Sequence, residues 1–204
     1  MATQADLDAA QVYTAIMEEA KFRALSINTL TVPGLALPVS LLREFCFLQL
    51  RMLCELIALG CLVAHGDIKE TKSPTFQKAY NAGDIVKRLE KLHPTFYPSP
   101  RKLEFSPGHV HLADYDREFL TKSELLTLYG KCGDALHRGS LRHLLDPKNQ
   151  PPADFRDIQE WGQKVLNLLS VHLISRVGGK FHFLVALEAA QAGGKVLVSV
   201  AESP

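Results

Sequence analysis

The residues best suited to acid–base chemistry stand close together between positions 129 and 143. His137 is of the one side-chain type that ordinarily changes charge between about pH 5 and 8. Asp134 precedes it by three residues, which is within hydrogen-bonding reach on a helix. A histidine of this kind can act as a general acid or base. Lys131 and Arg138 are candidate catalytic cations on either side of it, and Arg142 and His143 are candidate binding residues that follow.

A second polar group interrupts the most apolar stretch of the chain, residues 39–65. At about 100° per residue, Glu44, Arg51 and Glu55 fall within roughly 40° of one another on a helix. Such a stripe is either the solvent-facing edge of the helix or an internal polar seam beside a cleft. We therefore take Arg51 and Glu55 as candidate binding residues, together with Tyr129 and Asp134.

Two glycines accompany the histidine on the predicted helix. Gly130, Gly133, Asp134 and His137 fall within roughly 100° of one another. Glycines inside a helix cost about 1 kcal/mol each against alanine, and they usually permit another helix or a ligand to approach the backbone. A structural interpretation of the same residues pairs His137 with Asp134, and both with Arg51 or Glu55, inside a bundle.

The long apolar helix with its Arg/Glu stripe, followed by the run Tyr129-Gly-Lys-Cys-Gly-Asp-Ala-Leu-His137-Arg-Gly139, resembles the HEPN superfamily of helical bundles. In that family a helical histidine follows an arginine after four to six intervening residues. The resemblance covers about residues 39–176. It implies either a metal-independent endoribonuclease that works as a dimer, or a member that has lost catalysis and binds RNA, nucleotides or proteins.

The chain departs from the family pattern at the arginine. Lys131 stands five intervening residues before His137, and lysine lacks the planar fork with which arginine grips phosphate. A literal arginine–histidine spacing joins Arg138 to His143, but it crosses the predicted helix end at Gly139. The departures favour a HEPN-like module with weak or no catalysis, acting through RNA, nucleotide or protein. The alternatives are an endoribonuclease centred on His137, which would cleave through the RNA 2′-hydroxyl, and a structural dimerisation domain.

Two further clusters have both a functional and a structural explanation. His109 and His111, with Asp114 and Asp116, could bind zinc or manganese, but a polar loop beside Pro107 explains them better. Aromatic residues near Arg101 and Lys102 could stack single-stranded nucleic acid, or they could pin a long loop to the bundle. The aromatic residues are Phe96, Tyr97 and Phe105. No phosphate-binding glycine loop, G-x-S-x-G or H-E-x-x-H occurs, so no cofactor and no metal is predicted.

The composition limits the partners and the compartment. The 23 basic and 22 acidic residues leave a net charge of +1, which argues against sequence-specific duplex DNA binding but permits local RNA or nucleotide contacts. No secretory signal or C-x-x-C is present, and three of the four cysteines, Cys46, Cys54 and Cys61, share one face of the apolar helix. Charged residues break that helix as a membrane span. We expect a cytoplasmic protein, and a homodimer from the resemblance.

Helical spacing predicts most of the chain as a mainly α protein, an antiparallel helical bundle over about residues 5–176. The expected helices span residues 6–25, 39–65 and 73 or 81 to 92. Two more run from the capping box Thr121–Glu124 to a stop at Gly139, and from Asp154 to a stop at Gly178-Gly179. Proline between residues 94 and 107 predicts a long irregular insertion.

Alternation of residue types near the C-terminus predicts a β-hairpin over about residues 180–202, with its turn at Gly193-Gly194. A lone hairpin is marginal in water, so this one must pack on the bundle or pair with a further strand. Residues 29–32 or 109–112 could supply that strand, as could a second chain. We expect residues 1–204 to form a single domain.

Overall fold

Helices and one antiparallel sheet make up the fold. A computed structural model describes residues 2–32, 34–66, 68–79, 81–106, 109–137, 152, 154–176 and 181–202, with the backbone alone at 75, 77, 105 and 110. The helices are α1 (Gln4–Leu30), α2 (Val39–Ala64), η1 (Lys69–Lys72, 3-10), α3 (Pro74–Gln77), α4 (Ala82–Leu92), α5 (Lys122–Leu136), α7 (Arg156–Leu169) and η3 (Ala190–Ala192, 3-10). The strands are β1 (Ser99–Ser106), β2 (His109–Asp114), β3 (Val171–Ser175), β4 (Phe181–Ala189) and β5 (Lys195–Glu202).

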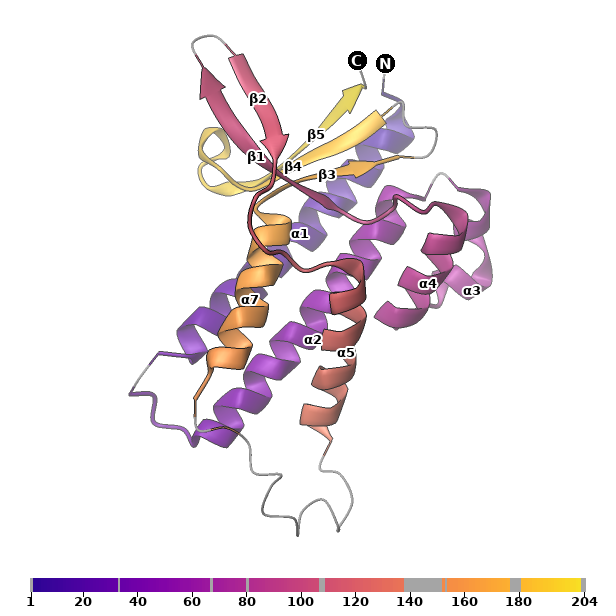
Figure 1. Cartoon of the computed structure of the whole chain (residues 1–204). Coiled ribbons are helices and arrows are strands. Elements are labelled where there is room, and N and C mark those ends of the chain that lie inside the picture. Colours follow the sequence, from indigo (N-terminus) through magenta and orange to yellow (C-terminus); the bar gives the residue numbers. More distant parts are fainter. Residues whose placement is uncertain are drawn as a thin grey trace.

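The expected helical bundle with only a C-terminal hairpin is wrong, because the chain builds a five-stranded antiparallel sheet in the order β2-β1-β3-β4-β5. Figure 1 shows the sheet at one end of the molecule, above the long helices α1, α2, α5 and α7. The fold is therefore mixed α and β. The predicted hairpin is present as β4 and β5, and its need for a further strand is met within the chain by β3.

Strand β3 was expected to be the end of a helix. Leu168, His172 and Leu173 continue the helical spacing of α7, yet the run Val171–Ser175 also alternates. The structure follows the alternation, with His172 and Ile174 buried and their neighbours half-buried. Pairing with β4 decides between the two patterns, because it satisfies the backbone of a β-branched segment that the core also buries.

The Pro-rich segment was expected to be an irregular insertion, and its second half is instead a hairpin. Pro100 stands at the second position of β1, where the strand pairs with β3, and residues 101–106 pair with residues 109–114 of β2. Proline is tolerated near the start of a strand. Pro107-Gly108, which we took as a loop signal, stands between two strands. Residues 109–112 therefore do form a strand, but it pairs with β1 and not with the C-terminal hairpin, so the expected pairing is wrong.

Helix α1 is longer than its sequence predicted. It continues to Leu30, so residues 29–32 form no strand. Ile27 lies in the core at 1% exposure. Helix propensity disfavours isoleucine by only a few tenths of a kcal/mol, whereas full burial of its side chain stabilises by about 2 kcal/mol. Burial therefore overrides the local preference.

The remaining helix boundaries follow the predicted caps closely. Thr121 and Glu124 form the expected capping box of α5. Asn81 caps α4, and a short helix, α3, begins after Ser73, so both proposed starts are used. Phe155 rather than Asp154 holds the cap position of α7, and Asp154 bonds the side chain of Arg156 instead.

Helix α2 lies at the centre of the helical layer, and it packs on α1, α4, α5 and α7. Within the described part of the chain it is the one helix long and apolar enough to cross a membrane by length and composition. Half of its most apolar window is buried against the rest of the protein. This burial is compatible with a core helix of a soluble protein. The four cysteines are free and buried, three of them on α2.

Candidate functional site

Three of the predicted binding residues meet where α2 packs on α5. Arg51 Nη2 donates a hydrogen bond to Tyr129 Oη at 2.9 Å, and Tyr129 donates to Glu55 Oε1 at 3.0 Å. The Arg51 Nε atom lies 3.3 Å from the same carboxylate oxygen. The guanidinium also lies 4.4 Å from the centroid of the Tyr129 ring, within cation–π range. We call Arg51, Glu55 and Tyr129 the α2–α5 cluster.

The α2–α5 cluster is half-open to solvent and nearly neutral. The side chain of Arg51 is 30% exposed and that of Glu55 is 18% exposed. Burial raises the pKa of Tyr129, and the hydrogen bond to Glu55 raises it further, so the phenol stays protonated at neutral pH. The part-exposed guanidinium of Arg51 can therefore still donate hydrogen bonds toward solvent, while the carboxylate of Glu55 offsets the positive charge of Arg51. This arrangement can contact an anion or a base edge through Arg51.

The two helical glycines contribute less than expected. A methyl group at Gly133 would lie 3.7 Å from Arg51 Nη1, which is ordinary van der Waals contact, and Gly130 faces open space. Alanine fits sterically at both positions. Close approach of a second helix therefore does not explain these glycines. Their effect is to leave the surface of α5 beside Arg51 free of side chains.

The predicted acid–base residues are not brought together. His137 and Asp134 are both exposed, and no hydrogen bond or ion pair joins their side chains in the ranges that the structure describes. The backbone N–H of His137 bonds to Gly133 O at 3.1 Å and ends α5. The expected polar pair inside the bundle is therefore not formed. Arg138, Arg142 and His143 lie outside the described residues.

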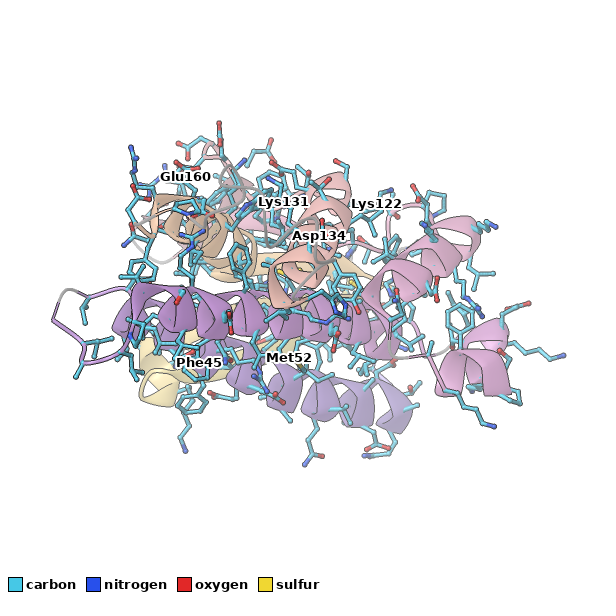
Figure 2. All side chains as sticks on the ribbon, turned by 90° about the horizontal axis from the view of Figure 1, so that it is seen from below. Phe45, Met52, Lys122, Lys131, Asp134 and Glu160 are labelled. Atoms are coloured by element: carbon cyan, nitrogen blue, oxygen red, sulfur yellow. The ribbon has the colours of Figure 1, made fainter. Side chains whose placement is uncertain are left out.

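Lys131 turns toward α7 and away from the α2–α5 cluster. Its Nζ atom lies 5.3 Å from the centroid of the Trp161 ring, and Lys164 Nζ lies 5.8 Å from the same centroid. Figure 2 shows Lys131 and Asp134 at α5, above α2 in this view, and Phe45 and Met52 along the lower edge of α2. The predicted phosphate-steadying lysine thus packs on an aromatic ring.

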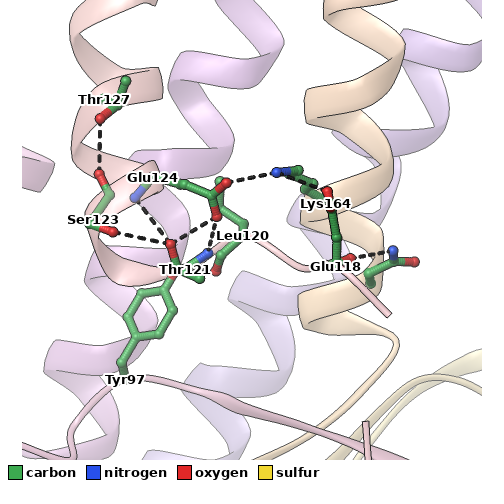
Figure 3. Close-up of polar contacts among 9 residues, drawn as sticks. Tyr97, Glu118, Leu120, Thr121, Ser123, Glu124, Thr127 and Lys164 are labelled. Atoms are coloured by element: carbon green, nitrogen blue, oxygen red, sulfur yellow. Dashed lines mark hydrogen bonds and ion pairs between the residues drawn. The ribbon is translucent and has the colours of Figure 1, made fainter. Parts of the chain in front are cut away.

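The start of α5 is tied to α7 by charge (Figure 3). Lys164 Nζ lies 2.7 Å from Glu124 and 3.2 Å from Glu118. The hydrogen bond to Glu124 is the main cause of a raised pKa for Lys164. Glu124 also completes the capping box through Thr121 N at 3.0 Å. These contacts are sufficient to explain the polar residues here, without a ligand.

The aromatic residues of the Pro-rich segment are structural anchors. Phe96 is fully buried, and Tyr97 donates a hydrogen bond to Leu120 O at 3.0 Å. Burial raises the pKa of Tyr97. The proposed stacking surface is therefore not formed by these two residues, and the side chain of Phe105 is outside the described set. Arg101, the expected cation, pairs with Asp114.

The histidines of β2 show no metal geometry. The His109 and His111 rings are exposed and lie 6.2 Å apart, centroid to centroid. Across the described ranges, no group of three or more histidine, cysteine or acidic side chains is placed to hold a metal.

A feature that the sequence reasoning missed is an exposed apolar surface over α1, the following loop and the start of α2. Large apolar side chains that are more than a third exposed gather there. Its most exposed member is Phe22, at 68%. We call this group of exposed side chains the apolar face; its members are Phe22, Leu25, Val32, Leu35, Leu37, Val39, Leu41, Phe45 and Leu48, of which Phe22 and Phe45 line a common groove. The available signal was the absence of any charged residue between Arg23 and Arg43.

A groove of about 860 Å³ runs between α1 and α2 within this face. Phe22, Leu30 and Phe45 line it. Its polar lining is held internally, because Arg23 bonds Glu19 at 2.6 Å and Gln49 at 2.9 Å. The groove can therefore accept an apolar side chain without leaving an unpaired charge on Arg23. Comparison with family models, curated proteins and solved structures finds no match to the chain.

Proposed function

We propose that the chain is a non-catalytic assembly module that forms a homodimer through the apolar face. The observation that carries the proposal is the group of large apolar side chains exposed between Phe22 and Leu48, with no charged residue between Arg23 and Arg43. Water-soluble monomers seldom expose contiguous apolar patches above a few hundred Å², and larger patches mark interaction sites.

The size of the apolar face suits a stable interface. A large apolar side chain presents on the order of 200 Å² when fully exposed. Nine such side chains at 38–68% exposure therefore offer several hundred Å². One partner in an interface of standard size contributes about 800 Å². The apolar face and its polar margin together are of that order.

The chemistry of the face favours a second copy as the partner. A two-fold interface brings the same patch against itself, so a charge close to the axis would meet its own copy. No charged residue stands between Arg23 and Arg43, and the net charge of +1 opposes association only weakly. The same surface carries both protruding side chains, such as Leu37, and the α1–α2 groove that could receive them.

The proposal agrees with the HEPN resemblance, which includes dimeric and non-catalytic members. We also propose that the protein is cytoplasmic. Four free, buried cysteines suit a reducing compartment, since none is placed to form a disulfide framework.

The test is the mass of the purified chain in solution, measured by light scattering after size exclusion over a range of concentrations. We expect twice the chain mass at micromolar concentration. Phe45→Glu and Leu48→Glu should each give a monomer with an unchanged circular dichroism spectrum. Leu92→Glu on α4 is the matched control, because Leu92 is exposed to nearly the same fraction as Leu48. A wild-type monomer at every concentration, or a dimer indifferent to both substitutions, would contradict the proposal. So would a monomer that binds phospholipid vesicles through the face.

A second candidate function is contact with RNA or a nucleotide at the α2–α5 cluster. The observation in its favour is the part-exposed guanidinium of Arg51, held over the Tyr129 ring and beside Gly133. Guanidinium planes and phosphate or base edges are frequent partners. Fluorescence anisotropy with a labelled single-stranded RNA tests it: Arg51→Gln should weaken binding at least tenfold. Equal binding by wild type and Arg51→Gln would remove this candidate.

A further inference from the structure

His65 caps the C-terminus of α2 and has no exposed surface. Its Nδ1 atom lies 2.7 Å from Cys61 O, one turn back on the same helix. Its Nε2 atom lies 2.9 Å from Ser175 O, at the end of β3. The ring therefore bridges the end of the central helix and a strand of the sheet.

Both ring nitrogens of His65 thus face carbonyl oxygens, which only accept hydrogen bonds. A neutral imidazole has one N–H donor and one bare nitrogen. Whichever tautomer is chosen, the bare nitrogen would point its lone pair at a carbonyl oxygen within 3 Å. Only the imidazolium donates to both. This requirement follows from the positions of the heavy atoms and does not depend on a choice of tautomer.

His172 provides an internal contrast, since it is equally buried. Its Nδ1 atom lies 3.0 Å from Leu169 O, and its Nε2 atom lies 2.8 Å from the hydroxyl of Tyr13, which can donate. One donor and one acceptor match the neutral ring. The two buried histidines therefore have opposite hydrogen-bonding demands, which predict opposite charge states.

The surroundings of His65 tolerate a positive charge. A helix C-terminus stabilises a cation, and charge-assisted hydrogen bonds are stronger than neutral ones. The His93 ring packs 4.9 Å away and the edge of Phe96 lies at 6.5 Å, centroid to centroid.

The titratable groups on each packed element bear on this charge. On α2, burial raises the pKa of the Cys61 thiol, and burial likewise raises the pKa of the Tyr97 phenol before β1, so both stay neutral.

On the β3 side, Arg176 follows Ser175 but pairs with Asp6, and the His182 ring bonds the Ser175 hydroxyl at 3.1 Å. Lys122 of α5 lies over the Phe96 ring. In η1 the charged side chains of Lys69, Glu70 and Lys72 are exposed, and the Thr71 hydroxyl donates to the backbone oxygen of Ile68.

We propose that His65 is an imidazolium at neutral pH and acts as a pH-dependent latch between α2 and β3. Loss of its proton leaves only one of the two ring hydrogen bonds, so the neutral ring cannot hold Cys61 O at the end of α2 and Ser175 O of β3 at the same time. The latch is therefore closed at neutral and mildly acidic pH and weakens as the pH rises. This inference is independent of the assembly proposed above.

Nitrogen NMR of histidine-labelled protein tests the proposal directly. At pH 7.5, about one unit above the ordinary histidine pKa, the full-length protein should show both His65 nitrogens protonated. His172 should show one protonated nitrogen in the same spectrum. Assignment comes from the loss of the corresponding signals in His65→Gln and His172→Gln. A single protonated nitrogen on His65 at pH 7.5 would overturn the proposal.

Chemical unfolding gives a second, independent readout. The ratio of the wild-type and His65→Gln unfolding equilibrium constants should change by about tenfold or more between pH 7 and pH 10, because a proton held by the folded state alone is lost over this range. The His172→Gln ratio should stay constant over the same range. A constant ratio for His65→Gln would also contradict the latch. If His65→Gln does not fold, the wild-type spectrum alone decides.

Discussion

The Tyr13 hydroxyl on α1 and the His172 ring on β3 form a hydrogen bond of 2.8 Å that is wholly buried. Because His172 Nδ1 faces a carbonyl, its Nε2 atom accepts and Tyr13 donates. The bond connects the first helix to a central strand 159 residues later in the chain. Phe183 packs edge-on against Tyr13 at a centroid distance of 5.9 Å and closes the pair from the sheet side.

The His172 pair predicts a loss of stability in acid. Burial lowers the pKa of His172 to about 4, from an ordinary value of 6.5. The unfolded chain then binds a proton between these values and the folded chain does not, so the stability present above pH 6.5 is lost as the pH falls toward 4. We expect a loss of about 2–3 kcal/mol from this group by pH 4.5. Urea unfolding of wild type and His172→Gln at pH 7 and 4.5 measures it. An equal loss in both proteins would contradict the assignment.

Removal of the Tyr13 hydroxyl should destabilise the protein although the core keeps its shape. Tyr13→Phe leaves the Nε2 atom of His172 without a donor, and an unsatisfied buried acceptor costs about 1–3 kcal/mol. Thermal unfolding at pH 7 measures the change. Tyr115→Phe is the control, since Tyr115 makes a ring contact with Phe119 and no hydroxyl bond is described for it. An equal shift in the two variants would show that the hydroxyl of Tyr13 is not special.

A bidentate ion pair joins the starts of α2 and α7. Arg43 Nη1 and Nη2 lie 2.9 Å and 2.6 Å from the two carboxylate oxygens of Asp157, and the Arg43 side chain is only 5% exposed. Burial raises the pKa of Asp157 and the bonds from Arg43 lower it more, so the net shift is downward. Asp157→Asn should cost about 1–2 kcal/mol, less than a fully buried pair because the carboxylate is partly solvated.

The neighbouring carboxylate is the control for this pair. Asp154 accepts a hydrogen bond from the exposed side chain of Arg156, and Asp154→Asn should leave the free energy of unfolding nearly unchanged, because exposed ion pairs contribute little. Urea unfolding at pH 7 compares the two variants. The Asp157 contribution should also fade as the pH drops through its lowered pKa. Equal effects of the two substitutions would contradict the buried role of Arg43.

The assembly proposal predicts that His137 has no catalytic role. Its side chain is exposed and without a described partner, so His137→Ala should leave the melting temperature unchanged. Neither wild type nor His137→Ala should cleave single-stranded RNA in the presence of a metal chelator, as followed by gel electrophoresis. Cleavage by wild type that is lost in His137→Ala would favour the endoribonuclease hypothesis instead.

Local sequence patterns were sufficient for much of the secondary structure. The long, largely apolar helix from Val39, the capping box at Thr121 and the hairpin around Gly193 each depend on residues within one or two turns of one another. The sequence also predicted Arg51, Glu55 and Tyr129 as binding residues, because a polar stripe on an otherwise apolar helix must face either solvent or a polar partner.

The local pattern could not decide which surface of each segment would be covered by other parts of the chain. The run after Leu169 satisfies a helix and a strand equally, and only the neighbouring β4 selects the strand. The residues of the apolar face look like core residues by type, and only the packing of α2 against its neighbours leaves Phe45 outside and Cys46 inside.

The two buried histidines show the same division most plainly. The sequence alone determined that His65 would end the apolar helix and that His172 would stand between apolar residues. Tertiary structure alone placed a carbonyl from β3 against one ring and a hydroxyl from α1 against the other. The reason is physical: helix spacing and caps depend on residues a few positions apart, whereas burial, strand pairing and the charge of an imidazole depend on atoms that distant segments bring within 3 Å.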